Sequence, residues 1–238
     1  MNKIHIITPV KDSIETTLRT IDSVFDSTSN IDSAYCIYND FSSPETTIVL
    51  ENEAEKKGFR LQNLCDLTHH PSPNYLLVLQ LAQKEAIRDG AHLVIVESDV
   101  VIAKDTLERM AESAAKLDHP GMIAAVTTDA SGEINFPYLF AKGYKKGVIK
   151  TKKRLSFCCT LLTNDYLKSF DFNELDPTKS WYDVFISHKS IELGFNNYLI
   201  TNLPVLHLPH SSRPWKHLKY TNPLKYYWRK FVNNKDKI

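Results

Sequence analysis

The order of apolar and polar positions along the first half of the chain predicts strands that alternate with amphipathic helices. Short apolar runs, typical of buried strands, lie at 4–10, 34–38, 93–96 and 123–126, and a short further strand is expected at 60–64. Helical periodicity covers 14–25, 44–57, 74–89 and 105–117, and Gly58 and Gly90 provide stops for the second and third of these helices. This alternation predicts an α/β fold with a mostly parallel central sheet flanked by helices.

The second half of the chain is less regular. A basic segment punctuated by glycines, at 143–153, predicts a solvated hairpin or loop. Apolar runs predict strands at 157–162, 197–200 and 205–207, and a helix over 180–193 ends before Gly194. Because no internal repeat or low-complexity linker divides the sequence, we expect a single domain over 1–238 with an elaborated second half.

Composition narrows the class of protein. The 238 residues are 42% hydrophobic, which is enough for a packed core. The formal net charge of +1 lacks the strong excess of basic residues that is typical of nucleic-acid-binding proteins. The four cysteines form no CxxC motif, so we expect reduced thiols in a cytoplasmic protein. No apolar run approaches the length of a membrane-spanning helix, and we expect a protein that is soluble or at most peripheral on a membrane.

Polar residues follow three of the predicted strands, at Thr8-Pro9, Asn39-Asp40 and Glu97-Ser98-Asp99. In open α/β sheets, ligands bind beyond the carboxyl ends of the strands, so we expect these residues to converge on one site. In extended chain, Glu97 and Asp99 would point to the same face. Paired carboxylates suit Mg²⁺ or Mn²⁺, which also take phosphate oxygens, and predict a metal-dependent enzyme acting on a nucleotide diphosphate.

Segments in both halves of the chain carry a resemblance to a known family. They are 6–10 with Asp12, Leu18 and Ser23, then 37–43, 97–99, 181–183 with the following helix, and 203–207. In this order they resemble the opening strand and helix, the Asp-Asp-Gly-Ser turn, the Asp-x-Asp motif, the catalytic-base helix and the closing strand of the family 2 glycosyltransferases. The resemblance implies a GT-A fold and transfer of a hexosyl group, with inversion, from a UDP-, GDP- or dTDP-sugar to a hydroxyl acceptor.

Three positions depart from the family pattern. Glu97 and Asn39 each replace an aspartate, Phe41 stands where glycine is usual, and the Arg-Asn pair of the family is not found within 74–86. A non-catalytic derivative that binds a sugar or a partner therefore stays open as an alternative. A sugar-phosphate nucleotidyltransferase is a further alternative, but it needs a glycine-rich basic loop after the first strand, which 8–12 is not.

The resemblance also implies roles for individual residues. Asp99 and His207 would bind Mn²⁺ or Mg²⁺, which neutralises the diphosphate leaving group. Donor contacts would come from Thr8, Pro9, Val10, Asp12, Asp40, Glu97 and Ser98. Glu97 could instead bind the metal through a water molecule. Several of these residues have a structural alternative. A carboxylate after a strand often forms a turn or a helix cap, Asn39-Asp40 forms ordinary turns, Asp12 suits a helix N-cap, and a histidine after a strand is usually structural.

Asp183 would be the general base that deprotonates the acceptor hydroxyl, and Trp181 beside it would stack on an acceptor sugar. The alternative is a capping box from Ser180 to Asp183, and the helix N-terminus would also weaken a carboxylate as a base. In-line attack assisted by one carboxylate would invert the anomeric carbon.

The resemblance divides the domain into a nucleotide- and metal-binding half at 1–110, an acceptor-binding half at 111–215 and a tail at 216–238. The acceptor would be a glycan or a lipid-linked glycan, as in polysaccharide assembly. Within 211–217, Arg213 and Lys216 could close over the diphosphate. The tail mixes aromatic and basic residues, which suits peripheral binding to the inner face of the cytoplasmic membrane. A helix packed on the domain or a homodimer contact is the alternative for the tail.

Overall fold

A mixed sheet organises the part of the chain that this computed structural model describes, which is residues 3–28, 31–208, 224 and 228. Its strands are β1 (Ile4–Val10), β2 (Ser33–Asn39), β3 (Arg60–Asn63), β4 (His92–Val96), β5 (Val100–Val101), β6 (Pro120–Thr128), β7 (Val148–Thr151), β8 (Cys159–Leu162) and β9 (Asn196–His207). The helices are α1 (Ile14–Ser27), α2 (Pro44–Lys57), α3 (Tyr75–Arg88), α4 (Thr106–Lys116), α5 (Asn164–Ser169) and α6 (Tyr182–Glu192). Short 3₁₀ turns are η1 (Leu64–Asp66), η2 (Leu139–Ala141) and η3 (Phe172–Glu174).

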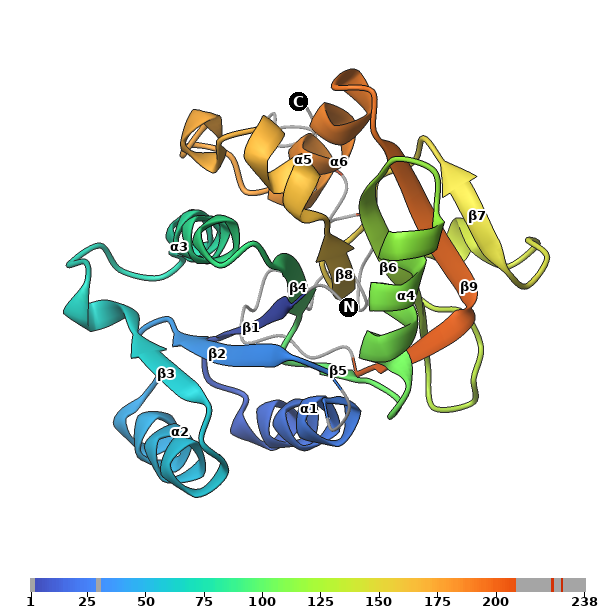
Figure 1. Ribbon diagram of the computed structural model, residues 1–238. Helices are drawn as coiled ribbons and strands as arrows, with labels where there is room; N and C mark the ends of the chain where they lie inside the picture. Colours follow the sequence, from blue (N-terminus) through green and yellow to red (C-terminus); the bar gives the residue numbers. More distant parts are fainter. Residues whose placement is uncertain (1–2, 29–30, 209–223, 225–227, 229–238) are drawn as a thin grey trace. The chain divides into compact units, whose positions relative to one another are not determined.

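The strands follow the order β3-β2-β1-β4-β8-β6-β9-β5, and β7 pairs with β9 (Figure 1). Pairing is parallel from β3 through β4 and between β6 and β9. It is antiparallel where β8, β5 and β7 join. The predicted α/β sheet flanked by helices is confirmed, with its parallel half built by the crossover helices α1 to α3.

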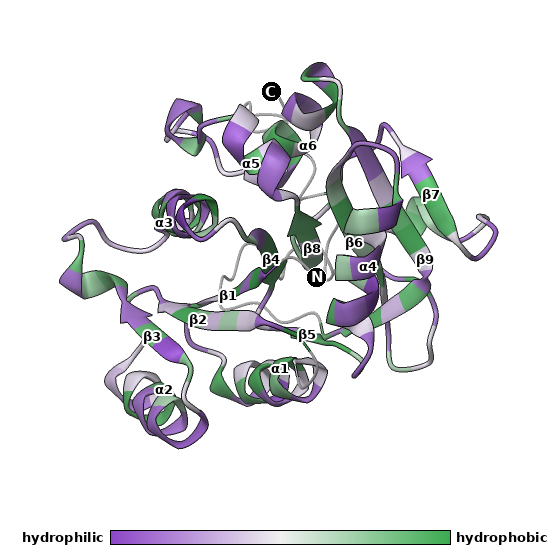
Figure 2. Ribbon diagram, viewed as in Figure 1, coloured by the Kyte–Doolittle hydropathy of each residue, from purple (hydrophilic) through white to green (hydrophobic). Residues whose placement is uncertain are grey.

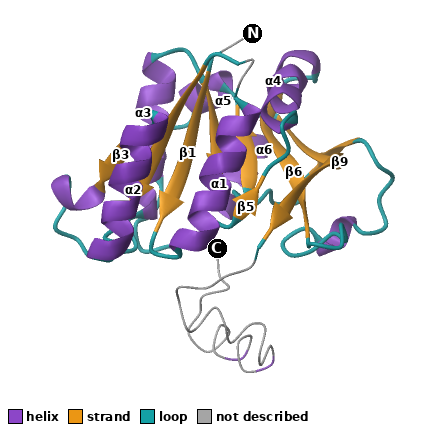
Figure 3. Ribbon diagram, turned by 90° about the horizontal axis from the view of Figure 1, so that it is seen from below, coloured by secondary structure: helices purple, strands orange, loops and turns teal. Residues whose placement is uncertain are grey.

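Helices cover both faces of the sheet. Ile7 and Ile95 pack in one core with residues of α3, α5 and α6, whereas Ile6 and Val94 pack in the other with residues of α1 and α4. Figure 3 shows α1 and α2 on the near side of the sheet. Because both faces of β4 and β8 are buried, these strands are apolar over most of their length (Figure 2) and give no alternating pattern.

Several predicted boundaries differ from the structure. The predicted strands at 197–200 and 205–207 are one strand, β9, whose register with β6 shifts between Ala125 and Val126. Pro204 lies inside β9 at this irregularity. Proline has no backbone N–H, and its missing hydrogen bond disrupts the pairing of the strands least where the register already shifts. The basic segment predicted as a hairpin or loop contains β7.

The start of α1 also differs from the prediction. Ser13 is its N-cap residue but makes no side-chain capping bond, and Asp12 lies outside the helix. Both residues adopt left-handed backbone, with φ of 56°.

The described residues up to Leu208 belong to one compact unit, and the chain divides after Leu208. The predicted tail at 216–238, the loop at 211–217 and their residues Arg213 and Lys216 lie outside the described residues, apart from Leu224 and Trp228. No helix among the described residues is long and apolar enough to cross a membrane.

Candidate functional site

The site lies where the connections of the sheet change direction, between β1 and β4. From β1 the chain passes to β2 on one side, and β4 pairs on the other side. Pairing of β1 with β4 stops at Ile7 and Ile95, whereas pairing with β2 continues to Val10 and Asn39. The last residues of β1, whose arrowhead is visible in Figure 3, therefore border the crevice in which open α/β sheets bind their ligands.

Asp99 and His207 meet across the β5–β9 ladder. Val100 pairs with His207, and the amide of Leu208 donates to the carbonyl of Asp99 at 2.8 Å. These backbone contacts place His207 Nε2 3.5 Å from Asp99 Oδ2, and both side chains are largely buried. The predicted metal ligands are thus brought together from positions more than one hundred residues apart in sequence.

The hydrogen bonding of His207 determines which ring nitrogen could bind a metal ion. Its Nδ1 lies 2.8 Å from the carbonyl oxygen of Phe136, which can only accept, so Nδ1 carries the proton. In the neutral imidazole, Nε2 then presents a lone pair to the Asp99 carboxylate. Two acceptors that face each other suit a shared cation, and a backbone carbonyl on Nδ1 is the usual support of a histidine ligand. Within the described residues, no group of three or more His, Cys, Asp or Glu side chains could hold a metal ion. Among the described residues, this pair is therefore the candidate metal site.

Glu97 takes a different partner from Asp99. The hydroxyl of Tyr75, on α3, donates to Glu97 Oε1 at 2.6 Å. Burial, and then the charge of Glu97, hold the pKa of Tyr75 well above its usual value, so the hydroxyl stays a donor. The ring of Tyr75 stacks on Phe157, with centroids 6.3 Å apart.

The expectation that Glu97 and Asp99 share one face of an extended strand is wrong. β4 ends at Val96, and the amide of Val100 donates to the carbonyl of Glu97 at 3.1 Å, which closes a turn. Ser98, between the two carboxylates, is buried in this turn.

Asp40 is buried and anchors the loop that precedes α3. It accepts hydrogen bonds from the Ser72 hydroxyl at 2.7 Å and from the backbone and side-chain N–H groups of Asn74 at 2.9 and 2.8 Å. A carboxylate offers about four acceptor positions, so these bonds use most of its capacity. Asp40 therefore shapes this loop whether or not it also contacts a nucleoside.

The unusual residues on either side of Asp40 have local explanations. The Asn39 amide donates to Thr47 and to the side-chain oxygen of Asn63, which an aspartate could not do. Phe41 has left-handed backbone, with φ of 57°, where the family has glycine. That conformation costs a non-glycine residue roughly 1–2 kcal/mol, and the packing of the Phe41 ring against the core offsets it.

The other predicted donor residues lie beside this turn. Thr8 is fully buried and its hydroxyl is 2.9 Å from that of Tyr35, so donor contact at Thr8 and Pro9 would involve the backbone. Val10 is buried, and its carbonyl accepts from the amide of Asp40. Asp12 accepts from the amide of Ser43, which ties the loop after β1 to the turn after β2.

Asp183 lies in the first turn of α6, 3.3 Å from the guanidinium of Arg154. The predicted capping box does not form, because Trp181 is the N-cap residue and no side chain caps the helix. Burial holds the pKa of Cys158 well above its usual value, and the charges of Asp99, Glu97 and Asp183 raise it further. The charges of the three predicted carboxylates therefore all act on one buried thiol.

No protein-family model and no curated protein matches the chain. Solved structures do match. GalNAc-T7 with UDP, GalNAc and Mn²⁺ superposes with a TM-score of 0.67 at 12% identity, over 89% of this chain and 45% of that one. TarS residues 1–349 of S. aureus, with UDP-GlcNAc, gives 0.68 at 16% identity, over 89% and 60%. The mannosyltransferase PcManGT of Pyrobaculum calidifontis, with GDP-Man and Mn²⁺, gives 0.62 at 13% identity, over 98% and 64%.

The chain has the GT-A fold. It spans about half to two thirds of the length of these glycosyltransferase structures. At identities of 12–16% the likeness establishes the fold and leaves the assignment to family 2 a prediction.

Sequence reasoning missed three residues that contact the candidate site residues. Tyr75, Phe136 and Arg154 contact Glu97, His207 and Asp183 respectively. None of the three lies in a motif, and their contacts join segments that are 22, 71 and 29 residues apart. The replacement of the family's aspartate by Glu97 is the one departure in the sequence that falls on these contacts, and it does not identify Tyr75 as the partner.

Proposed function

We propose that the protein is a metal-dependent glycosyltransferase that moves a hexosyl group from a nucleotide-diphosphate donor to a hydroxyl acceptor, with inversion, in the manner of family 2. The observation that carries the proposal is the Asp99–His207 pair, in which a carboxylate oxygen and an imidazole nitrogen face each other at the crevice of a GT-A fold. The glycosyltransferase structures that share this fold were determined with UDP, UDP-GlcNAc or GDP-Man, two of them with Mn²⁺.

In this proposal Asp99 and His207 hold Mn²⁺ or Mg²⁺, which supplies positive charge to the departing diphosphate. The backbone at Thr8 and Pro9, and Asp40 through its remaining acceptor capacity, hold the nucleoside of a UDP-, GDP- or dTDP-sugar. Val10, Asp12 and Ser98 complete the walls of this donor site. Glu97, oriented by Tyr75, contacts the sugar or the ribose.

At the acceptor side, Trp181 stacks on a sugar and Asp183 accepts the proton of the acceptor hydroxyl. The acceptor oxygen forms its bond to the anomeric carbon as the bond from that carbon to the diphosphate breaks, and attack from the opposite side inverts the centre. Arg154, which pairs with Asp183, orients the carboxylate until the acceptor binds. A glycan or lipid-linked glycan is the proposed acceptor, as in polysaccharide assembly.

A non-catalytic sugar-binding protein is the second candidate. It is favoured by Asp40, whose carboxylate is largely occupied by Ser72 and Asn74, and by the Arg154 pairing of Asp183. Such a protein would bind a donor without turning it over.

The test is thermal unfolding with UDP, GDP or dTDP, each with and without Mn²⁺. A ligand at about one hundred times its Kd stabilises the folded state by about 2.7 kcal/mol, which raises the Tm of a domain of this size by roughly 5–11 °C. We expect one nucleotide to do so only with Mn²⁺, and Asp99→Asn and His207→Ala to abolish the shift. The control Asp105→Asn removes an exposed carboxylate elsewhere and should leave the shift intact.

Absence of a metal-dependent shift with every nucleotide would overturn the proposed donor site. If a nucleotide raises the Tm but the sugar of the matching donor is transferred neither to an acceptor nor to water, the non-catalytic candidate is favoured. With turnover, Asp183→Asn should lower kcat by at least about a hundredfold, as expected for loss of a general base, and leave the nucleotide shift unchanged.

A further inference from the structure

One strongly basic surface has no part in the proposed chemistry. It surrounds β7, and its lysines are Lys142, Lys145, Lys146, Lys150, Lys152 and Lys153, all of them exposed. No aspartate or glutamate occurs between Glu133 and Asp165. The ion pairs formed within the described residues involve none of these six lysines. We call these six lysines, with Leu139, Tyr144 and Val148, the basic patch.

The basic patch also exposes apolar side chains. Leu139, Tyr144 and Val148 are 53%, 39% and 47% exposed, and they are half of the large hydrophobic residues that are exposed within the described part of 3–208. Phe140 joins the apolar and basic parts. The Tyr144 ring meets Phe140 edge-on with centroids 6.0 Å apart, and Lys153 Nζ lies 4.4 Å from the centre of the Phe140 ring.

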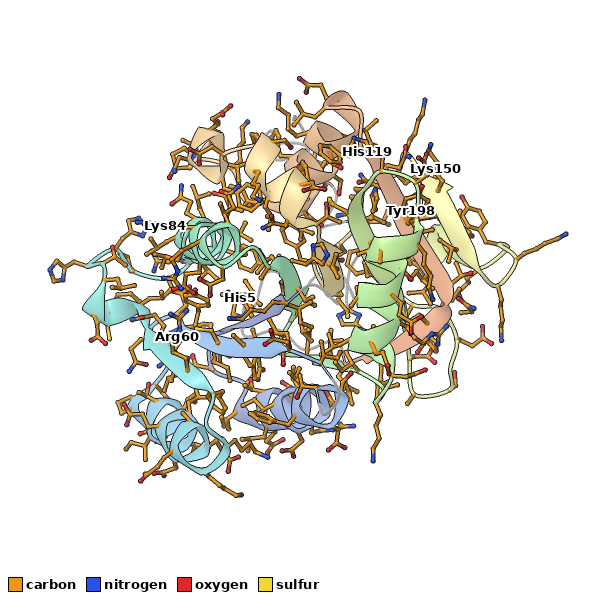
Figure 4. The ribbon with its side chains drawn as sticks, in the orientation of Figure 1. His5, Arg60, Lys84, His119, Lys150 and Tyr198 are labelled. Atoms are coloured by element: carbon orange, nitrogen blue, oxygen red, sulfur yellow. The ribbon has the colours of Figure 1, made fainter. Side chains whose placement is uncertain are left out.

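The strand geometry presents charge and apolar surface together. β7 pairs with β9, antiparallel, and Val148 and Lys150 are both exposed while Ile149 between them is half-buried. Residues two apart share a face of a strand, so Val148 and Lys150 project from the same side. Figure 4 labels Lys150 on β7, beside Tyr198 of β9. Residues Gly143 to Ile149, in the loop before β7 and at its start, line a shallow hollow that is open to solvent.

We propose that the basic patch docks on a bilayer surface that carries anionic lipid headgroups. Lysines near such a surface are attracted to its negative potential, and exposed aromatic and aliphatic side chains enter the boundary between headgroups and acyl chains. A soluble polyanion would use the lysines alone. The exposure of Leu139, Tyr144 and Val148 among the lysines therefore favours a lipid surface.

The position of the basic patch suits an enzyme that works at a membrane. Arg154 follows Lys153 directly in the chain and contacts Asp183, the proposed base. A bilayer bound at the patch would lie next to the proposed acceptor side, although lipid binding itself does not depend on the proposed transfer.

The experiment is sedimentation of the full chain with vesicles, without nucleotide. Vesicles of phosphatidylcholine alone are compared with vesicles that contain phosphatidylglycerol. Each lysine near an anionic surface strengthens binding about fivefold, so the triple variant Lys145→Gln/Lys146→Gln/Lys150→Gln should partition about a hundredfold more weakly. The matched control, Lys84→Gln/Lys104→Gln/Lys168→Gln, removes three exposed lysines outside the patch and should partition at least tenfold better than the patch variant.

All variants keep residues 209–238, so binding through that segment is the same in each. Equal partitioning of wild type and the patch variant would overturn the proposal. The variant Leu139→Ser/Val148→Thr tests the apolar contribution and should bind anionic vesicles several-fold more weakly. If wild type binds inorganic polyphosphate as tightly as anionic vesicles, and this variant weakens neither, the partner is a soluble polyanion and the lipid proposal fails.

Discussion

The contact between Tyr75 and Glu97 gives the most direct test of how the candidate site is held together. Tyr75→Phe removes one oxygen atom, and with it the 2.6 Å hydrogen bond to the carboxylate. The ring remains, so its stacking on Phe157 is retained. Any change in stability therefore reports the hydroxyl alone.

The expected magnitude follows from the charge of the acceptor. Hydrogen bonds to charged groups contribute roughly 1.5–3 kcal/mol, against about 1 kcal/mol for neutral pairs. We expect Tyr75→Phe to lower the free energy of unfolding by roughly 1.5–3 kcal/mol, or the Tm by roughly 3–12 °C in a domain of this size.

The assay is urea unfolding at pH 7, read as a shift of the midpoint at constant m. Tyr144→Phe is the control, because the described residues supply no hydrogen-bond partner for that hydroxyl, and it should change stability by less than about 0.5 kcal/mol. A double-mutant cycle with Glu97→Gln isolates the contribution of the Tyr75–Glu97 bond. In that background Tyr75→Phe should cost only about 1 kcal/mol, since the remaining bond is neutral. An undiminished cost there would refute the assignment of the effect to the charged bond.

Two further predictions concern buried thiols and a close contact. Burial raises the pKa of Cys159 to about 12 and raises that of Cys158 as well, so both thiols stay protonated in the folded state when the unfolded chain ionises. Stability should be intact below about pH 8.5 and then fall, approaching about 1.4 kcal/mol per pH unit for each thiol, until the folded pKa is reached. Urea midpoints from pH 8 to 11 should fall less in Cys158→Ala/Cys159→Ala, and an unchanged slope would contradict the reasoning. At Gly121, an added Cβ would lie 2.1 Å from Ser190 Oγ and 2.8 Å from Phe195 Cβ, so Gly121→Ala should lower stability by about 1–3 kcal/mol. Gly143→Ala meets no atom within 4 Å and should be nearly neutral in the same melts.

The parallel half of the sheet could be predicted from sequence because its signals are local. β1 and β4 are buried apolar runs, β2 becomes one over its second half, and a helix with a clear period or stop lies between successive strands. β3 is short and only half-buried, and its place follows from the helices on either side of it. The antiparallel additions gave weaker signals. β5 has only two residues, and β7 is a solvent-exposed edge with lysine in it. Its pairing depends on β9, which lies far along the chain.

The joining of two predicted strands into β9 shows a second limit. Pro204 and the polar residues before it are typical of a break between strands. The structure instead accommodates them at a register shift against β6, so that the strand continues to His207. Pairing over the whole of β9 is what sets His207 opposite Val100, next to Asp99. A local reading of the sequence could name His207 but could not place it.

The two carboxylates after β4 show why the roles within the site could not be assigned by spacing. The spacing of Glu97 and Asp99, two residues apart, predicts that their side chains point to the same face only if the chain between them stays extended. Because the chain turns at Ser98, Glu97 is directed to Tyr75 on α3 and Asp99 to His207 on β9. A metal held at Asp99 would therefore rely on the imidazole and the diphosphate rather than on a second adjacent carboxylate. Under this arrangement, Glu97→Asp should not restore a family-like metal pair. The shorter side chain would lose Tyr75 while Asp99 and His207 still bind the ion, so metal affinity measured with nucleotide should survive while stability falls. If Glu97→Asp lowers metal affinity as much as it lowers stability, Glu97 is itself a metal ligand.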